Sequence, residues 1–91
     1  MPVIRVKDLD GAIEEANSSV YGLGASIWTK NLDKFRQGCE QLNAGIIWVN
    51  QHLKVAPEVP FGGTKESGIG RENGAHALSD YMELKTVMIK S

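Results

Sequence analysis

Few side chains in this 91-residue chain could perform chemistry. Cys39 is the only cysteine, but it falls on the apolar stripe of an expected helix with no base placed nearby, so we interpret it as a buried structural thiol. His52 and His76 are the only histidines, and two histidines alone are a weak basis for a metal site, so we expect none. His76 is expected on the polar face of a helix. His52 directly follows a buried strand, where α/β proteins place their sites, and is a candidate binding residue.

The glycine-rich stretch from Gly62 to Gly70 could suggest a phosphate-binding or dinucleotide-binding site. A phosphate-binding loop needs Lys-Ser or Lys-Thr directly after its last glycine, whereas Thr64 and Lys65 precede the second glycine group. The dinucleotide fingerprint also fails, because no strand leads into Gly68. We therefore expect these glycines to permit tight turns and close backbone approach, and we assign no cofactor-binding residue to the chain.

The first half of the chain must supply the elements that position these residues. Apolar spacing predicts an α/β fold in which three strands and two helices alternate as βαβαβ in a parallel half-sheet. The expected strands are residues 2–6, 25–29 and 46–49, and the expected helices are residues 9–16 and 32–42, with a turn at residues 21–24. Asp8 and Asn31 are expected N-caps, and Gly45 is expected to stop the second helix in a left-handed conformation. Trp28 and Trp48 fall in strands and are expected in the core.

The second half of the chain has a different residue pattern. Residues 50–70 hold several glycines and prolines and no convincing period, which predicts a long loop. A helix is expected from Arg71 to Met82, and the alternation over residues 83–90 predicts a terminal strand.

Composition narrows the function classes. Ten basic and eleven acidic residues give a formal charge of −1, which predicts no electrostatic affinity for nucleic acid or for acidic membranes. No apolar run approaches the roughly 20 residues of a membrane helix. A single cysteine and an N-terminus without a secretory apolar core predict an intracellular, cytoplasmic protein.

The sequence from Pro57 to Glu72 resembles the signature of the NAD(P)-dependent aldehyde dehydrogenase superfamily. From Pro60 it reads Pro-Phe-Gly-Gly, one residue, Lys, one residue, Ser-Gly, one residue, Gly, then Arg-Glu, without a gap. Upstream segments follow family usage in family order: residues 2–6, 12–17, 21–29 and 45–50. The resemblance covers essentially the whole chain and identifies it with the C-terminal portion of the family's catalytic domain.

The resemblance implies a division of roles. In the family a cysteine attacks the aldehyde, a hydride passes to NAD or NADP, and a glutamate activates the water that releases the acid. Those residues and the cofactor domain match no position here, so no catalytic residue is expected and the chain alone should bind no cofactor. Phe61 matches an aromatic position that lines the family's substrate tunnel. The loop from Gln51 to Val59 matches the variable loop that shapes this tunnel, so His52 and Leu53 are expected to line it. Residues 1–82 correspond to a partial catalytic domain and residues 83–91 to an oligomerisation strand, with Thr86 to Lys90 expected to pair with another subunit or with the rest of the enzyme.

Three functions follow as hypotheses. The first is a truncated aldehyde dehydrogenase segment that is inactive alone. The second is a non-enzymatic binding or self-association module that reuses this fold. The third is a small independent enzyme built on Cys39 and a histidine, which no sequence feature favours.

Overall fold

Two helices begin where the sequence supplies an N-cap. In the computed structural model, which describes all residues from 1 to 91, α1 spans Leu9–Ser18 and α2 spans Leu32–Gln41. The side chain of Asp8 accepts a hydrogen bond at 2.9 Å from a backbone N–H of the first turn of α1, and that of Asn31 accepts one at 3.0 Å in α2. Both N-cap predictions are confirmed, because a short polar side chain in this position satisfies an N–H group that has no partner within the helix.

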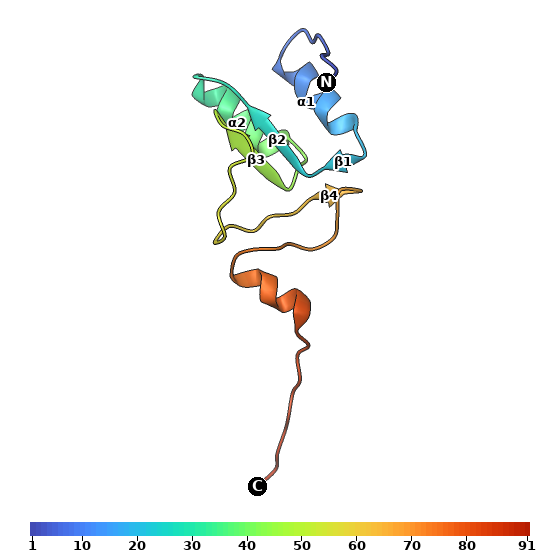
Figure 1. Cartoon of the computed structure of the whole chain (residues 1–91), viewed down its shortest axis with the longest axis vertical. Helices are drawn as coiled ribbons and strands as arrows, with labels where there is room; N and C mark the ends of the chain where they lie inside the picture. Colours follow the sequence, from blue (N-terminus) through green and yellow to red (C-terminus); the bar gives the residue numbers. More distant parts are fainter.

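The strands form two small sheets. β2 (Gly24–Ile27) and β3 (Ile46–Val49) pair in parallel across α2, which confirms the predicted parallel pairing and its helical crossover (Figure 1). β1 (Tyr21–Gly22) pairs antiparallel with β4 (Thr64–Lys65). Part of the expected turn and part of the expected loop are therefore short strands, which local sequence patterns did not indicate.

The two faces of the β2–β3 sheet have different neighbours. On one face, the side chain of Ile27 fills the space beside Gly38 of α2, with Ile27 Cδ1 2.5 Å from where a Cβ of Gly38 would lie. On the other face, the ring of Trp48 packs over Gly24. Trp48 is 5 % exposed and Ile13 of α1 is 6 % exposed, and these two side chains are the buried hydrophobic core.

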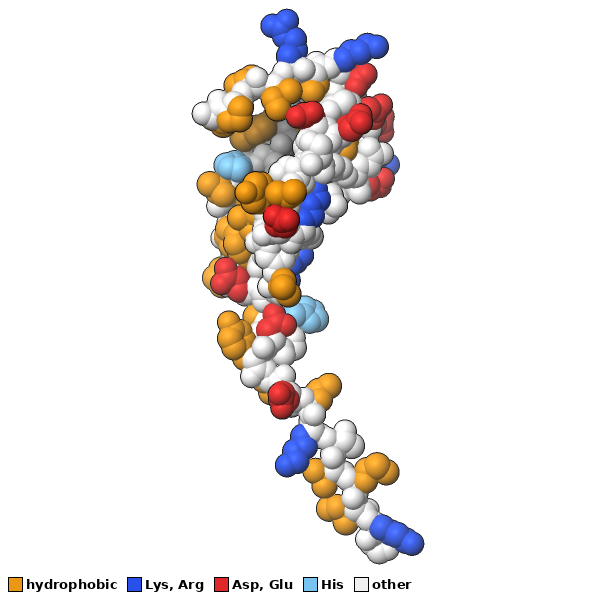
Figure 2. Space-filling view, turned by 90° about the vertical axis from the view of Figure 1, so that its right-hand side faces the viewer, with side chains coloured by type: hydrophobic (Ala, Val, Ile, Leu, Met, Phe, Trp, Pro, Cys, Tyr) orange, Lys and Arg blue, Asp and Glu red, His pale blue; other side chains and the backbone are white.

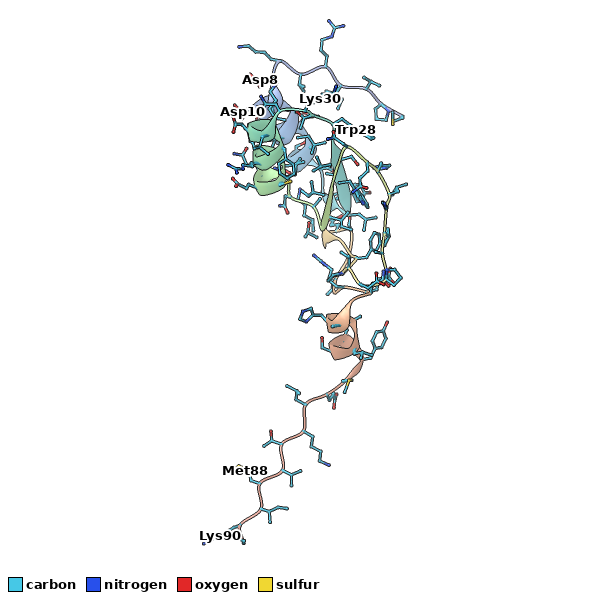
Figure 3. All side chains as sticks on the ribbon, turned by 90° about the vertical axis from the view of Figure 1, so that its left-hand side faces the viewer. Asp8, Asp10, Trp28, Lys30, Met88 and Lys90 are labelled. Carbon is cyan, nitrogen blue, oxygen red and sulfur yellow. The ribbon has the colours of Figure 1, made fainter.

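The two predicted terminal strands are absent. Residues 1–6 and 82–91 have no regular secondary structure, and the last residues run away from the rest of the chain, with Met88 and Lys90 projecting from the tail (Figure 3). The strand predictions for residues 2–6 and 83–90 are wrong for this chain. Alternation specifies an extended backbone, but a strand also needs a partner for its N–H and C=O groups.

The last helix is shorter and tighter than predicted. Instead of an α-helix over residues 71–82, a 3₁₀ helix (η1) spans Ala75–Tyr81. Asn73 and Gly74 precede it with φ values of 62° and 68°. Because left-handed residues cannot continue a right-handed helix, η1 cannot extend toward Arg71.

Three single-residue predictions are corrected. Cys39 is exposed, because Gly38 rather than Cys39 takes the position that faces the sheet. Trp28 is 67 % exposed, because β2 ends at Ile27 and the indole lies beyond the packed region (Figure 3). Gly45 does not adopt a left-handed conformation; α2 has already ended, and Gly45 instead lies against the backbone of Gly62.

The chain exposes more surface than a compact protein of the same mass. Its radius of gyration is 17.9 Å, whereas a compact domain of this length has about 12 Å. Its accessible surface is 7854 Å², against about 5200 Å² for a compact monomer of this mass. Five of 91 residues are buried, and Figure 2 shows apolar side chains open along the narrow lower part. The chain therefore leaves much of its apolar surface uncovered.

Candidate functional site

One candidate site lies under the loop that follows β3. A cavity of about 290 Å³ opens there, on the side where Trp48 packs. Eight residues line it, six of them hydrophobic: Ile46, Ile47, Trp48, Gln51, Lys54, Val55, Ala56 and Val59. An apolar wall with few polar groups suits a small organic ligand.

The location of this site follows from the strand directions. Because β2 and β3 are parallel, their carboxyl ends meet at one edge, where open α/β sheets place ligands. Asn50 ties the two ends together there: its Oδ1 accepts from the N–H of Thr29 at 2.8 Å, and its Nδ2 donates to the Thr29 carbonyl at 2.9 Å. The loop therefore leaves β3 in a fixed direction.

His52 and Leu53 occupy the start of this loop. His52 Nδ1 lies 2.5 Å from Ser26 Oγ, and its ring meets the Trp48 ring edge to face, with centroids 5.4 Å apart. Leu53 has φ of 55° and is 67 % exposed. Such a backbone costs a bulky residue roughly 1–2 kcal/mol, and strain of this kind concentrates at functional sites.

Phe61 occupies a different region. It is half-buried and exchanges two backbone hydrogen bonds of 2.8 Å with Glu72. With Arg71 and Tyr81 it lines a separate cavity of about 540 Å³. The structure thus brings His52 and Leu53 together and leaves Phe61 apart from them. The substrate-binding roles of all three residues stay predictions.

The polar residues of the glycine-rich stretch bind the chain's own backbone. Lys65 Nζ donates to the carbonyls of Asn17 and Ser19, at 2.7 and 2.9 Å, at the end of α1. Arg71 donates from one guanidinium nitrogen to the Gly63 and Gly70 carbonyls, at 2.7 and 2.8 Å. No helix begins directly after these glycines, so the residues present do not fit a dinucleotide phosphate site.

The chain contains neither a metal-binding cluster nor a membrane-spanning helix. No three His, Cys, Asp or Glu side chains gather as a metal centre would require. None of the helices is long and apolar enough to span a bilayer.

Comparison with known proteins identifies the family of this chain. The sequence profile of the aldehyde dehydrogenase family matches residues 1–87. The chain belongs to the aldehyde dehydrogenase family. It is 49 % identical over 82 residues to phenylacetaldehyde dehydrogenase of Pseudomonas fluorescens, and 45 % identical over 89 residues to retinaldehyde dehydrogenase 3 of Homo sapiens. These matches cover 90 % and 98 % of this chain but 16 % and 17 % of the relatives.

Solved aldehyde dehydrogenases share the fold of this segment. The indole-3-acetaldehyde dehydrogenase of P. syringae, solved with NAD+, superimposes with a TM-score of 0.87 at 43 % identity. That match covers 94 % of this chain and 17 % of the solved chain. The chain thus spans about a sixth of the length of the aldehyde dehydrogenases that it matches.

Sequence reasoning missed Ser26 and the role of Trp48 at the candidate site. Ser26 and Trp48 are register partners in the parallel pair, and His52 contacts both. The sequence contained part of the necessary information, because the predicted parallel pairing implied that one residue of β2 would lie beside Trp48. The register itself was needed to select Ser26.

Proposed function

We propose that this chain is the carboxyl-terminal part of an aldehyde dehydrogenase catalytic domain. In that reading it serves NAD(P)-dependent oxidation of aldehydes to carboxylic acids only when the rest of the domain covers it. The observation that carries the proposal is the exposed surface of 7854 Å², roughly half as much again as a compact monomer of this mass exposes. Its match to about a sixth of each relative supports the same reading.

The segment's contribution is the wall of a substrate channel. The loop over residues 51–59 supplies part of the apolar groove beside Trp48. The ring of His52 contacts Trp48, and Leu53 follows it in the same loop. Phe61 lines a second cavity that another part of the domain would join to the channel. The nucleophile, the general base and the cofactor site belong to residues outside this chain. Cys39 is not offered as the nucleophile, because no hydrogen-bonding base accompanies it on α2.

The test is an NAD(P)H-formation assay with a short aliphatic and an aromatic aldehyde. We expect no turnover by the purified 91-residue chain. We expect turnover by a hybrid in which residues 1–87 replace the matching segment of the P. syringae enzyme, to which the chain is 43 % identical. Turnover by the chain alone that disappears in Cys39→Ser would overturn the proposal, and so would a folded hybrid without activity.

Self-association through the tail is a second candidate function. Leu84, Val87, Met88 and Ile89 are between 68 % and 106 % exposed on an extended segment without a partner strand. Two such tails could pair with each other or with a sheet edge, because unpaired backbone groups and apolar side chains both favour strand addition.

The oligomeric state of the chain tests this candidate. Val87→Pro removes a backbone donor and should give a monomer in sedimentation equilibrium, whereas the matched Val87→Ala variant keeps the donor and should still associate. An oligomer that survives Val87→Pro would exclude pairing through residues 86–90.

A further inference from the structure

His52 is exposed, yet two contacts hold its ring. Nδ1 is hydrogen-bonded to Ser26 Oγ at 2.5 Å, and the ring stands edge to face against Trp48 at an interplanar angle of 69°. The only other histidine, His76, is also exposed, and its imidazole makes no hydrogen bond. Exposed side chains ordinarily sample several rotamers. The double contact at His52 therefore preorganises one ring orientation that nothing in the core requires.

The partners of His52 are rigid themselves. Ser26 in β2 and Trp48 in β3 stand opposite each other in the parallel register. Trp48 is 5 % exposed and donates its indole N–H to the Lys54 carbonyl at 2.7 Å, which also fixes the loop beyond His52. Two strands and a loop thus position one imidazole, whose Nε2 has no partner within the chain.

The contact with Ser26 also favours one tautomer of the His52 ring. The Ser26 hydroxyl has no other hydrogen-bond partner, and an unprotonated imidazole nitrogen is a better acceptor than a hydroxyl oxygen. This difference favours donation from the hydroxyl to Nδ1, which leaves the single proton of a neutral ring on Nε2. In that tautomer His52 presents an N–H donor beside Trp48, one of the residues that line the apolar groove.

We propose that Ser26 is a positioning residue that holds His52 as an Nε2–H donor, and that this donor selects aldehydes with an acceptor oxygen remote from the carbonyl. The acceptor can be an ether, hydroxyl or carboxylate oxygen, and the groove beside Trp48 takes the hydrocarbon body. A single fixed donor can discriminate between aldehydes. An aldehyde without the acceptor oxygen removes water from the Nε2–H group of His52 and leaves that group without a hydrogen-bond partner. The substrate class rests on the proposed function, whereas the tautomer does not.

The tautomer is measured on the full 91-residue chain. Long-range ¹H–¹⁵N spectra of the labelled chain distinguish protonated from unprotonated ring nitrogens. We expect His52 to hold its proton on Nε2 and His76 to show a mixture. Ser26→Ala should make His52 resemble His76, and Ser26→Thr, which keeps the hydroxyl, should restore the single tautomer. Identical tautomer populations at the two histidines of the unsubstituted chain, or a proton on Nδ1 of His52, would overturn the positioning role.

Selectivity is measured in the hybrid enzyme with two aldehydes of equal length, one with an ether oxygen where the other has a methylene. Ser26→Ala should lower the ether-to-methylene ratio of kcat/KM about fivefold through KM, as expected for one neutral hydrogen bond, and Ser26→Thr should restore it. A ratio unmoved by Ser26→Ala would overturn the substrate class. A hybrid inactive toward every aldehyde would count against the proposed function and with it the substrate class, while the spectra would still decide the tautomer.

Discussion

Gly45 marks the tightest backbone approach in the chain, so Gly45→Ala should disrupt the fold. An added Cβ would lie 2.8 Å from the Gly62 carbonyl carbon and 3.1 Å from Gly63 Cα, and closer still to the Gly62 oxygen. Those atoms are backbone, so no rotamer change can relieve the clash. Moving Gly45 instead would break its N–H bond to Gly22 and the neighbouring bond from Ile46 to Leu23, of 2.9 and 3.1 Å.

The expected cost combines these two effects. Overpacking costs about 1–3 kcal/mol, and each lost hydrogen bond costs about 1 kcal/mol. With two hydrogen bonds lost, we therefore expect Gly45→Ala to lower the free energy of unfolding by about 3–5 kcal/mol. For a domain of this size, the lower end of that range corresponds to a fall in Tm of about 12–24 °C.

The assay is thermal unfolding of the chain followed by circular dichroism, with Gly11→Ala as the matched control. At Gly11, inside α1, an added Cβ meets no atom closer than 3.4 Å, so this variant should gain up to about 1 kcal/mol of helix propensity. The same chemical change should thus have opposite signs at the two glycines. Equal Tm values for the two variants would refute the close-approach account of Gly45.

Three further predictions follow from single contacts. Lys65→Met should lower the free energy of unfolding in urea by about 1–2 kcal/mol, because two charged hydrogen bonds to the end of α1 disappear from an exposed site, whereas Lys34→Met should change it little, since the Lys34 side chain makes no hydrogen bond. Cys39 should react stoichiometrically with a water-soluble thiol reagent without denaturant, and a thiol that reacts only in urea would contradict its exposure. Asn50→Ala should be less stable than Asn50→Gly by about 1 kcal/mol in the same urea titration, because both lose the bonds to Thr29 but only alanine resists φ of 52°; equal midpoints would argue against backbone strain at this position.

Local signals predicted the elements that local interactions determine. Asp8 and Asn31 each cap a helix within three residues, so both helix starts could be read from the sequence. The β1–β4 pair joins segments more than 40 residues apart through a two-residue register, and no local pattern marks such a pair. The strand prediction for residues 83–90 failed for the opposite reason: the alternation is clear, but no segment of this chain pairs with the tail.

The candidate site was predictable in position but not in mechanism. His52 was singled out because it follows a parallel strand, and the structure places it at that edge. Cys39 was misplaced because a period of 3.6 residues does not decide between adjacent positions, and close packing against Ile27 demanded the glycine beside it.

The residues that reveal the family and the residues proposed to set specificity are different ones. Lys65 and Arg71 of the signature donate to carbonyls of this chain, and the lack of a side chain at Gly45 lets its backbone lie against that of Gly62. These contacts are made to backbone atoms, so they should form in any family member with the same backbone conformation in this segment. The loop over residues 51–59 makes fewer such contacts and can vary without disturbing β3, which is where selection for a different aldehyde would act. Substitution of Lys65 or Arg71 should therefore lower stability, and with it the turnover of all substrates alike, whereas substitution in the loop should change the relative kcat/KM values of different substrates.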